Sequence, residues 1–172
     1  MTPAKDQGGC GSCWSFAAVG ALESKILING GPEYDLSEQQ QISCNSDMDG
    51  CVGGSMDTLK FWYNEKPVEE SCARYVEDKT ACSSVSHCGG LPYHTTDFYY
   101  VDADNIASVK SSLHDDGPAY FRFDVYSDFE GDFGSGLWWN GSSGEVYTHS
   151  SGYERGGHGY LGFRLALSPG QQ

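Results

Sequence analysis

The sequence predicts an α+β protein, with a helical half over residues 1–102 and a β-rich half over residues 103–172. Two patterns support this fold class. Apolar residues recur at helical spacing near the start of the chain, up to the helix-breaking Gly30-Gly31-Pro32. Apolar and polar residues alternate from Ala119 to Val125, as in a strand with one buried face. We expect a cleft where the two halves meet.

Three helices are expected in the helical half. The first begins at Cys13 and is largely buried. The second begins at Ser37-Glu38-Gln39-Gln40, which is typical of a capping box, and extends toward Cys44. The third covers residues 55–63, and residues 64–103 are expected to be mostly loop held by disulfides. The apolar positions of the first helix are Trp14, Ala17, Ala18, Ala21 and Leu22.

The β-rich half is expected to open with a helix over residues 104–113. Asp116-Gly117-Pro118 predicts a turn before the alternating strand. Glycine-rich sequence of the kind found in hairpins then continues to Gly162.

Charge and cysteine content narrow the class of protein. The formal net charge of −14 would repel nucleic acid and anionic membranes, so neither is expected as a partner. No stretch is apolar over the ~18 residues of a transmembrane helix. Seven cysteines indicate an oxidising compartment, with three disulfides and one free thiol. A reduced cytosolic protein with seven thiols is the alternative.

The most informative motif is Gln7-Gly8-Gly9-Cys10-Gly11-Ser12-Cys13-Trp14. The dipole of a helix favours the thiolate of a cysteine in its first turn, and an imidazole across a cleft would complete the activation. The glycines let the backbone pass close to a substrate. The Gln7 amide could donate, together with the Cys13 backbone N–H, to a developing oxyanion. The pattern indicates nucleophilic catalysis by Cys13.

Cys10 through Trp14 match the Cys-Gly-[Ser/Ala]-Cys-[Trp/Tyr] signature of papain and the cathepsins. His158 lies 145 residues after Cys13, within the roughly 130–150 residues that separate cysteine and histidine in that family. The sequence therefore resembles the papain-family, cathepsin-like cysteine proteases. Further stretches that match in order are Thr2-Pro3-Ala4-Lys5-Asp6-Gln7, Leu36-Ser37-Glu38-Gln39, Gly50-Cys51-Val52-Gly53-Gly54, Gly117-Pro118, Val125-Tyr126-Ser127-Asp128-Phe129 and Gly156-Gly157-His158.

The resemblance implies a papain-like two-lobed fold and a cysteine-type endopeptidase that works through a thioester acyl-enzyme. Cys13 would be the nucleophile, His158 the general base and Gln7 part of the oxyanion hole. The implied substrate-binding residues are Gly53, Gly54 and Trp14, with the two glycines pairing their backbone with an extended peptide. The implied disulfides join Cys10 to Cys51 and Cys44 to Cys82, which leaves Cys72 and Cys88 to pair with each other.

The resemblance also implies partners and a compartment. Peptide or protein substrates are expected, with a propeptide or cystatin-like inhibitors as further partners. A monomer is expected, without cofactor or metal, in a secreted, lysosomal or vacuolar setting.

Three departures from the family pattern concern the C-terminal part. The family orients its histidine with an Asn in an Asn-Ser-Trp-Gly motif, whereas no Asn follows Asn140 here. Residues 165–172 resemble nothing in the family, and Gly159 stands where the family usually has Ala. We therefore expect a C-terminally incomplete antiparallel β-barrel lobe and a chain truncated at both ends, without signal peptide or propeptide.

Other interpretations of these residues exist. Cys10 and Cys13 could form a redox pair, or they could bind zinc with His87 and Cys88. Trp138 and Trp139 could contact substrate or only pack. A protein of another class, a catalytically dead fragment or pseudoenzyme that binds extended peptides on the protease scaffold, would also carry these motifs.

Overall fold

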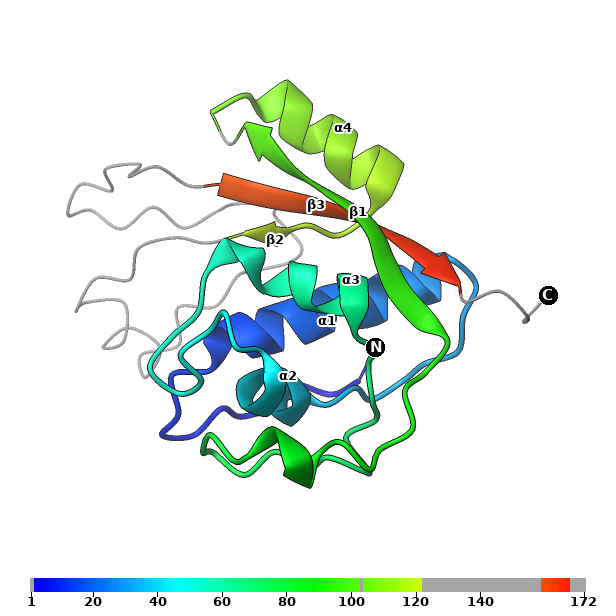
Figure 1. Cartoon of the computed structure of the whole chain (residues 1–172). Coiled ribbons are helices and arrows are strands. Elements are labelled where there is room, and N and C mark those ends of the chain that lie inside the picture. The colour runs from blue at the N-terminus through cyan, green and yellow to red at the C-terminus, as the bar shows by residue number, and fades with distance from the viewer. Residues whose placement is uncertain (1, 103, 122–158, 168–172) are drawn as a thin grey trace. The chain divides into compact units, whose positions relative to one another are not determined.

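The computed structural model describes residues 2–102, 104–121 and 159–167, all of which belong to one compact unit. Figure 1 shows its helices and its sheet. The helices are α1 (Cys13–Ile28), α2 (Glu38–Cys44), the 3₁₀ helix η1 (Met56–Lys60), α3 (Phe61–Asn64), η2 (Cys82–Ser84) and α4 (Ile106–Asp116), and the strands are β1 (Tyr93–Asp102), β2 (Tyr120–Phe121) and β3 (Gly159–Leu167). The predicted α+β class is confirmed.

Helix α1 is the centre of the main apolar core. Leu22 and Ile26 are completely buried, and they pack with Leu59 and Trp62 from the next helical segment. Tyr120 of β2 belongs to the same cluster, so the core joins α1 to the sheet. The helix ends where the sequence predicts, because Gly30 adopts φ +80°, which continues no helix. Ala17, which was expected on the buried face, is exposed.

Helix α2 begins with half of the predicted capping box. The Ser37 side chain accepts a hydrogen bond from the Gln40 backbone N–H at 3.1 Å. The reciprocal bond is absent among these residues, because the Gln40 side chain instead donates to the Lys66 carbonyl and accepts from the Val68 N–H. The Ser37 N–H donates to the Val68 carbonyl. The Gln40 side chain, which would form the second half of the capping box, thus joins residues 66–68 to α2.

A three-stranded antiparallel sheet follows, in the order β1-β3-β2. Residues 93–102 were predicted as loop, and that prediction was wrong, because they form β1. The register slips by one residue between Thr95 and Asp97, a β-bulge at Thr96, so the strand lacks the regular alternation by which it could be recognised. β3 extends through residues 165–167, for which the sequence suggested no family counterpart.

Helix α4 packs against β1 and β3. It begins at Asn105, whose side chain accepts from the N–H groups of Ala107 and Ser108, and Gly117 with φ +84° follows its end. The helix predicted over residues 104–113 is therefore present and slightly longer. Of the strand predicted from Ala119 to Val125, only β2 lies within the described residues.

Residues 64–92 contain little regular structure and are held by disulfides, as expected. The cysteine pairs are Cys10–Cys51, Cys44–Cys82 and Cys72–Cys88, which are the pairs implied by the sequence resemblance. A small apolar cluster of Val68, Ala73 and Val85 lies within the segment. None of the helices in the described part of the chain has the length and apolar character needed to cross a membrane.

Candidate active site

Cys13 is the first residue of α1, and its side chain is exposed. The other six cysteines are all in disulfides, so Cys13 carries the single free thiol. The N–H groups of Ser15 and Phe16 donate to the Ser12 carbonyl, which closes the first turn of α1. The dipole of α1 favours a negative charge at this position.

The loop before Cys13 is tied to a second loop around Cys51. Besides the Cys10–Cys51 disulfide, the Gly11 N–H donates to the Cys51 carbonyl at 2.8 Å. A Cβ atom on Gly11 would lie 2.5 Å from that carbonyl oxygen, so only glycine allows this approach. The pairing of Cys10 with Cys51 also excludes the alternative in which Cys10 and Cys13 form a redox pair.

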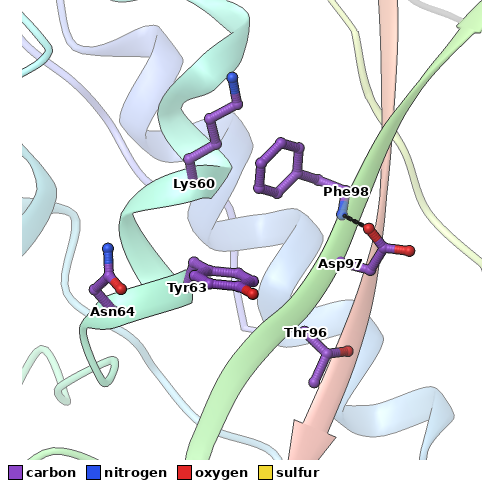
Figure 2. Close-up of a pocket in the computed structure, with 6 residues that line it drawn as sticks. All are labelled: Lys60, Tyr63, Asn64, Thr96, Asp97 and Phe98. Carbon is purple, nitrogen blue, oxygen red and sulfur yellow. Dashed lines mark hydrogen bonds between the residues drawn. The ribbon is translucent and has the colours of Figure 1, made fainter.

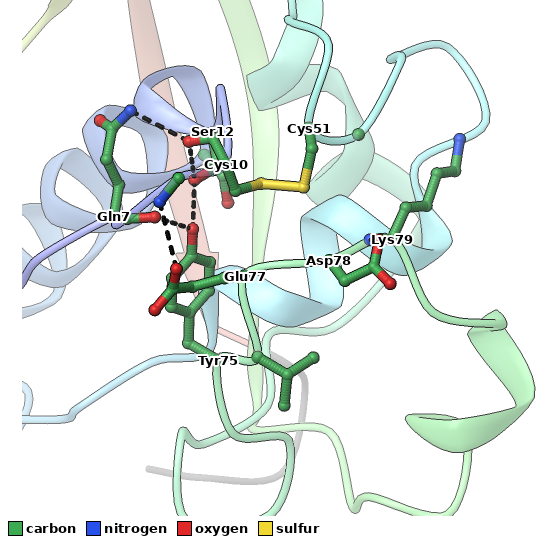
Figure 3. Close-up of a disulfide and its surroundings, with 12 residues drawn as sticks. Gln7, Cys10, Ser12, Cys51, Tyr75, Glu77, Asp78 and Lys79 are labelled. Carbon is green, nitrogen blue, oxygen red and sulfur yellow. Dashed lines mark hydrogen bonds between the residues drawn. A yellow bond between two sulfur atoms is a disulfide. The ribbon is translucent and has the colours of Figure 1, made fainter.

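Gln7 lies at the beginning of the same loop and is half-buried. Its Nε2 donates to the Cys10 carbonyl at 3.0 Å, as Figure 3 shows. Because a side-chain amide has two N–H groups, this bond fixes the orientation of the amide and uses one of its two donors. The second N–H group of the Gln7 amide takes no part in the hydrogen bond to the Cys10 carbonyl.

Gly53 and Gly54 follow shortly after Cys51, and Gly54 lies close to Trp14. The indole Nε1 donates to the Gly50 carbonyl at 2.9 Å, and a Cβ atom on Gly54 would collide with the indole ring. Gly53 adopts φ +154°, a conformation that L side chains rarely take. Trp14 is only 3% exposed, which leaves almost no indole surface for the substrate contact implied by the sequence. It supports the glycine loop from within instead.

The structure thus brings together Gln7, Cys13 and the loop of Gly53 and Gly54. His158 and the pair Trp138 and Trp139 lie outside the described residues. The pairing of Cys13 with His158 therefore remains a prediction.

Two residues beside this site carried no sequence signal. The Tyr75 hydroxyl lies 2.6 Å from the Gln7 carbonyl and 2.7 Å from the Ser12 hydroxyl, and the Glu77 carboxylate accepts from the Gly9 N–H at 3.1 Å. Both residues are in the segment that was expected to be disulfide-held loop. Their contacts span more than 60 positions in the chain, and no local motif reports such a distance.

An ion pair between the part-exposed Lys5 and the buried Glu38 fixes the segment that leads to Gln7. The Lys5 Nζ donates to both carboxylate oxygens of Glu38, at 2.9 and 3.0 Å, and lies 2.6 Å from Asp35. Burial raises the pKa of Glu38 to about 7, although the hydrogen bonds from Lys5 oppose that rise. Burial lowers the pKa of Lys5, but its hydrogen bonds to Asp35 and Glu38 outweigh this, and the pKa is raised overall.

Two further carboxyl groups lie in the same region. Glu23 of α1 is 4% exposed and accepts from the Leu36 N–H and the Thr2 hydroxyl. Glu70 accepts from the Tyr75 N–H. Burial raises the pKa of both glutamates, against the effect of these hydrogen bonds. Four carboxyl groups, those of Glu23, Asp35, Glu38 and Glu70, thus interact with Lys5 in the segment that leads to Gln7.

Other candidate sites lie elsewhere. The ligand atoms of Cys72, His87 and Cys88 lie within 4.8 Å of one another, but the two sulfur atoms are joined in a disulfide. The zinc alternative that included Cys10 fails because Cys10 is also in a disulfide.

A shallow pocket of about 340 Å³ lies between α3 and β1 (Figure 2). Lys60 is placed over the ring of Phe98, whose edge-to-face neighbour is Tyr63. Six residues line the pocket: Lys60, Tyr63, Asn64, Thr96, Asp97 and Phe98.

Comparison with known proteins identifies the family of this chain. The family described as papain family cysteine protease matches residues 1–158. Cysteine proteinase B of Leishmania mexicana and cysteine proteinase 2 of Leishmania pifanoi are each 54% identical over 56 residues, which make up 33% of this chain and 13% of each relative.

Solved structures give the same result. The Carica candamarcensis cysteine protease CMS1MS2, solved in complex with E-64, matches with a TM-score of 0.62 and 29% identity over 67% of this chain and 54% of its own. Digestive procathepsin L 3 from the larval midgut of Tenebrio molitor matches with a TM-score of 0.59 and 30% identity over 69% of this chain and 40% of its own. The chain thus spans about half or less of the length of these relatives, and it belongs to the papain family of cysteine proteases.

Proposed function

We propose that this chain carries the nucleophile of a cysteine endopeptidase. The observation that supports this most directly is the exposed, unpaired Cys13 at the first residue of α1, in a chain whose other cysteines are all in disulfides. The Cys13 thiolate attacks the carbonyl carbon of a peptide bond. The amine leaves with a proton, and water then hydrolyses the thioester to release the acid and regenerate the thiol.

Three further groups complete the proposed reaction. His158 takes the proton from Cys13 and passes it to the leaving amine, a role that rests on its place in Gly156-Gly157-His158. The second N–H of the Gln7 amide and the backbone N–H of Cys13 donate to the oxyanion of the tetrahedral intermediate. The substrate lies extended along Gly53 and Gly54, whose missing side chains leave the backbone accessible.

The partners follow from this reaction. Substrates are peptides or proteins, and a propeptide or an inhibitor of the cystatin type would cover the same residues. Among the solved relatives, the ragweed pollen protease Amb a 11 was determined in its proform, and it is 32% identical to this chain with a TM-score of 0.60 over 66% of this chain and 35% of its own. Three disulfides support a secreted, lysosomal or vacuolar compartment. The alternative of an inactive peptide-binding protein is not favoured, because the matched relatives are proteases.

The proposal is tested with an epoxysuccinyl probe of the E-64 type at mildly acidic pH, without reductant, followed by peptide mapping. We expect a single label on Cys13. His158→Ala should abolish it, because the imidazole that maintains the thiolate is removed, while the matched control His114→Ala should label normally. Label spread over several cysteines, or no label on the unchanged chain, would refute the assignment of Cys13 as an activated nucleophile.

A further inference from the structure

The loop of residues 7–12, which begins with Gln7 and ends next to Cys13, is hydrogen-bonded to Tyr75 and Glu77. Figure 3 shows the Tyr75 hydroxyl between two groups of this loop, the Gln7 carbonyl at 2.6 Å and the Ser12 hydroxyl at 2.7 Å. Gln7 carries the proposed oxyanion donor, and Ser12 immediately precedes the nucleophile. One hydroxyl therefore joins the beginning of the loop to its end.

The hydrogens of this network determine its direction. A tyrosine hydroxyl has one hydrogen, and Tyr75 donates it to the Gln7 carbonyl, which can only accept. Ser12 must then donate to the Tyr75 oxygen, with the Cys10 carbonyl at 3.3 Å as its alternative acceptor. The Cys10 carbonyl also accepts from the Gln7 amide. The main chain of Gln7 is thus fixed by Tyr75 and its side chain by Cys10, so both ends of the residue are held.

Tyr75 is itself firmly placed. Its ring makes an edge-to-face contact with Phe16 of α1, with centroids 5.0 Å apart, and packs against the buried cluster of Trp14, Ile42 and Met48. Its backbone N–H donates to Glu70. Burial raises the pKa of the hydroxyl, so it remains protonated and able to donate.

Glu77 makes a second contact with the same loop. It is the one non-glycine residue with positive φ, at +56°, in the described part of the chain. This conformation is costly for a residue with a Cβ and tends to persist where the surroundings enforce it. Its carboxylate accepts from the Gly9 N–H at 3.1 Å and lies so close to Gly8 that a Cβ atom there would collide with it. Gly8 has φ +57°, so the two loops meet through two unusual backbone conformations.

We propose that Tyr75 and Glu77 are positioning residues of the peptidase, which hold the Gln7 amide in place for the oxyanion without acting on the Cys13 thiol. The inference rests on the proposed function, because it assigns these residues to the oxyanion part of that reaction. Neither residue touches the substrate in this arrangement. Both act through Gln7 and the backbone of the loop.

Tyr75→Phe separates the two parts of the reaction. The variant keeps the ring but loses the hydrogen bond to the Gln7 carbonyl, while Ser12 can turn to its alternative acceptor, the Cys10 carbonyl. We therefore expect kcat for peptide hydrolysis to fall about 10-fold, with little change in KM. The rate at which iodoacetamide alkylates Cys13, and the pH dependence of that rate, should remain as in the unchanged chain. Tyr63→Phe is the matched control, since Tyr63 is exposed and its ring contacts Phe98 of β1 instead of the loop.

A double-mutant cycle distinguishes positioning from a general loss of structure. In a Gln7→Ala background the oxyanion donor is already gone, so Tyr75→Phe should lower kcat by less than twofold instead of about 10-fold. Glu77→Ala should act in the same direction with a smaller effect, and Glu65→Ala is its exposed control. Equal losses from Tyr75→Phe with and without Gln7, or an equal loss of alkylation rate, would overturn the proposal.

Failure of the proposed function would be visible separately. If the unchanged chain neither hydrolyses peptides nor reacts with the epoxysuccinyl probe, the peptidase assignment fails. Hydrogen exchange then tests separately whether Tyr75 and Glu77 stabilise the loop of residues 7–12. The amides of residues 7–12 should exchange faster in Tyr75→Phe and Glu77→Ala than in Tyr63→Phe or the unchanged chain. Unchanged exchange in both variants would overturn the proposal in either case.

Discussion

The helix-packed region, residues 13–62, and the disulfide-held segment, residues 64–92, are stabilised by different means. The first buries Leu22, Ile26 and Trp62 completely around α1. The second has one small apolar cluster, no helix longer than η2, and two disulfides. The proposed site depends on both kinds of stabilisation. Its loop of residues 7–12 leads directly into α1 and is also hydrogen-bonded to Tyr75 and Glu77 of the disulfide-held segment.

The largest expected effect comes from removing the disulfide that joins the two regions. Cys44–Cys82 closes a loop of 38 residues, and the double variant Cys44→Ala, Cys82→Ala should lose about 4 kcal/mol of unfolding free energy. Urea unfolding without reductant measures this loss. Hydrogen exchange should rise mainly in residues 64–92 and little in α1. A uniform rise over both regions would show that they are not held independently.

A cavity made in the apolar core around α1 tests how much this core contributes to the free energy of unfolding. Leu22→Ala removes a completely buried side chain and should cost about 3 kcal/mol. Ile28→Ala, in the same helix but 65% exposed, should cost less than about 0.5 kcal/mol. Thermal and urea unfolding of the two variants give the comparison. Similar losses for both would contradict the burial of Leu22 in the core and the exposure of Ile28.

The smallest expected effect is a dependence of stability on pH. The pKa of Glu38 is raised from 4.5 to about 7, so the folded state binds a proton that the unfolded state has released between these values. The resulting stabilisation is complete below pH 4.5 and is lost as the pH rises through about 7. Glu23 and Glu70 act in the same direction.

Unfolding in urea at a series of pH values measures this slope. Glu38→Gln should flatten it, because the amide does not titrate, whereas the exposed control Glu65→Gln should leave it unchanged. A stability that rises with pH over this range in the unchanged chain would contradict the assignment to Glu38.

Local signals made α1, α2 and α4 predictable from sequence. Helical spacing, the Ser37 cap and the glycines at the helix ends act over a few residues, and the structure follows them. The alignment of Cys13 with the start of α1 was predictable for the same reason. Trp14 shows the limit of such reasoning. Helical spacing placed it among the buried positions of α1, whereas the substrate contact implied by the resemblance needs an exposed indole, and the side chain is only 3% exposed.

Features that depend on distant partners were not predictable. Tyr93 of β1 pairs with Leu167 of β3, and nothing near residues 93–102 reports that partner. The hydrogen bonds from Tyr75 to Gln7 and from Gly9 to Glu77 likewise join segments 68 residues apart. A single sequence contains no record of such pairings unless a family motif happens to include both residues.

The bulge at Thr96 bears on how the length of this chain can vary. Thr95 pairs with Leu165 and Asp97 pairs with Arg164, so Thr96 is an additional residue between two otherwise continuous stretches of ladder. Deleting it would leave every pairing partner of β1 in place. The same residue lets Thr96, Asp97 and Phe98, three consecutive positions, all line one pocket, which regular alternation does not allow. A one-residue deletion here would therefore remodel that pocket while preserving the sheet, so this chain can become shorter at Thr96 without a change of fold.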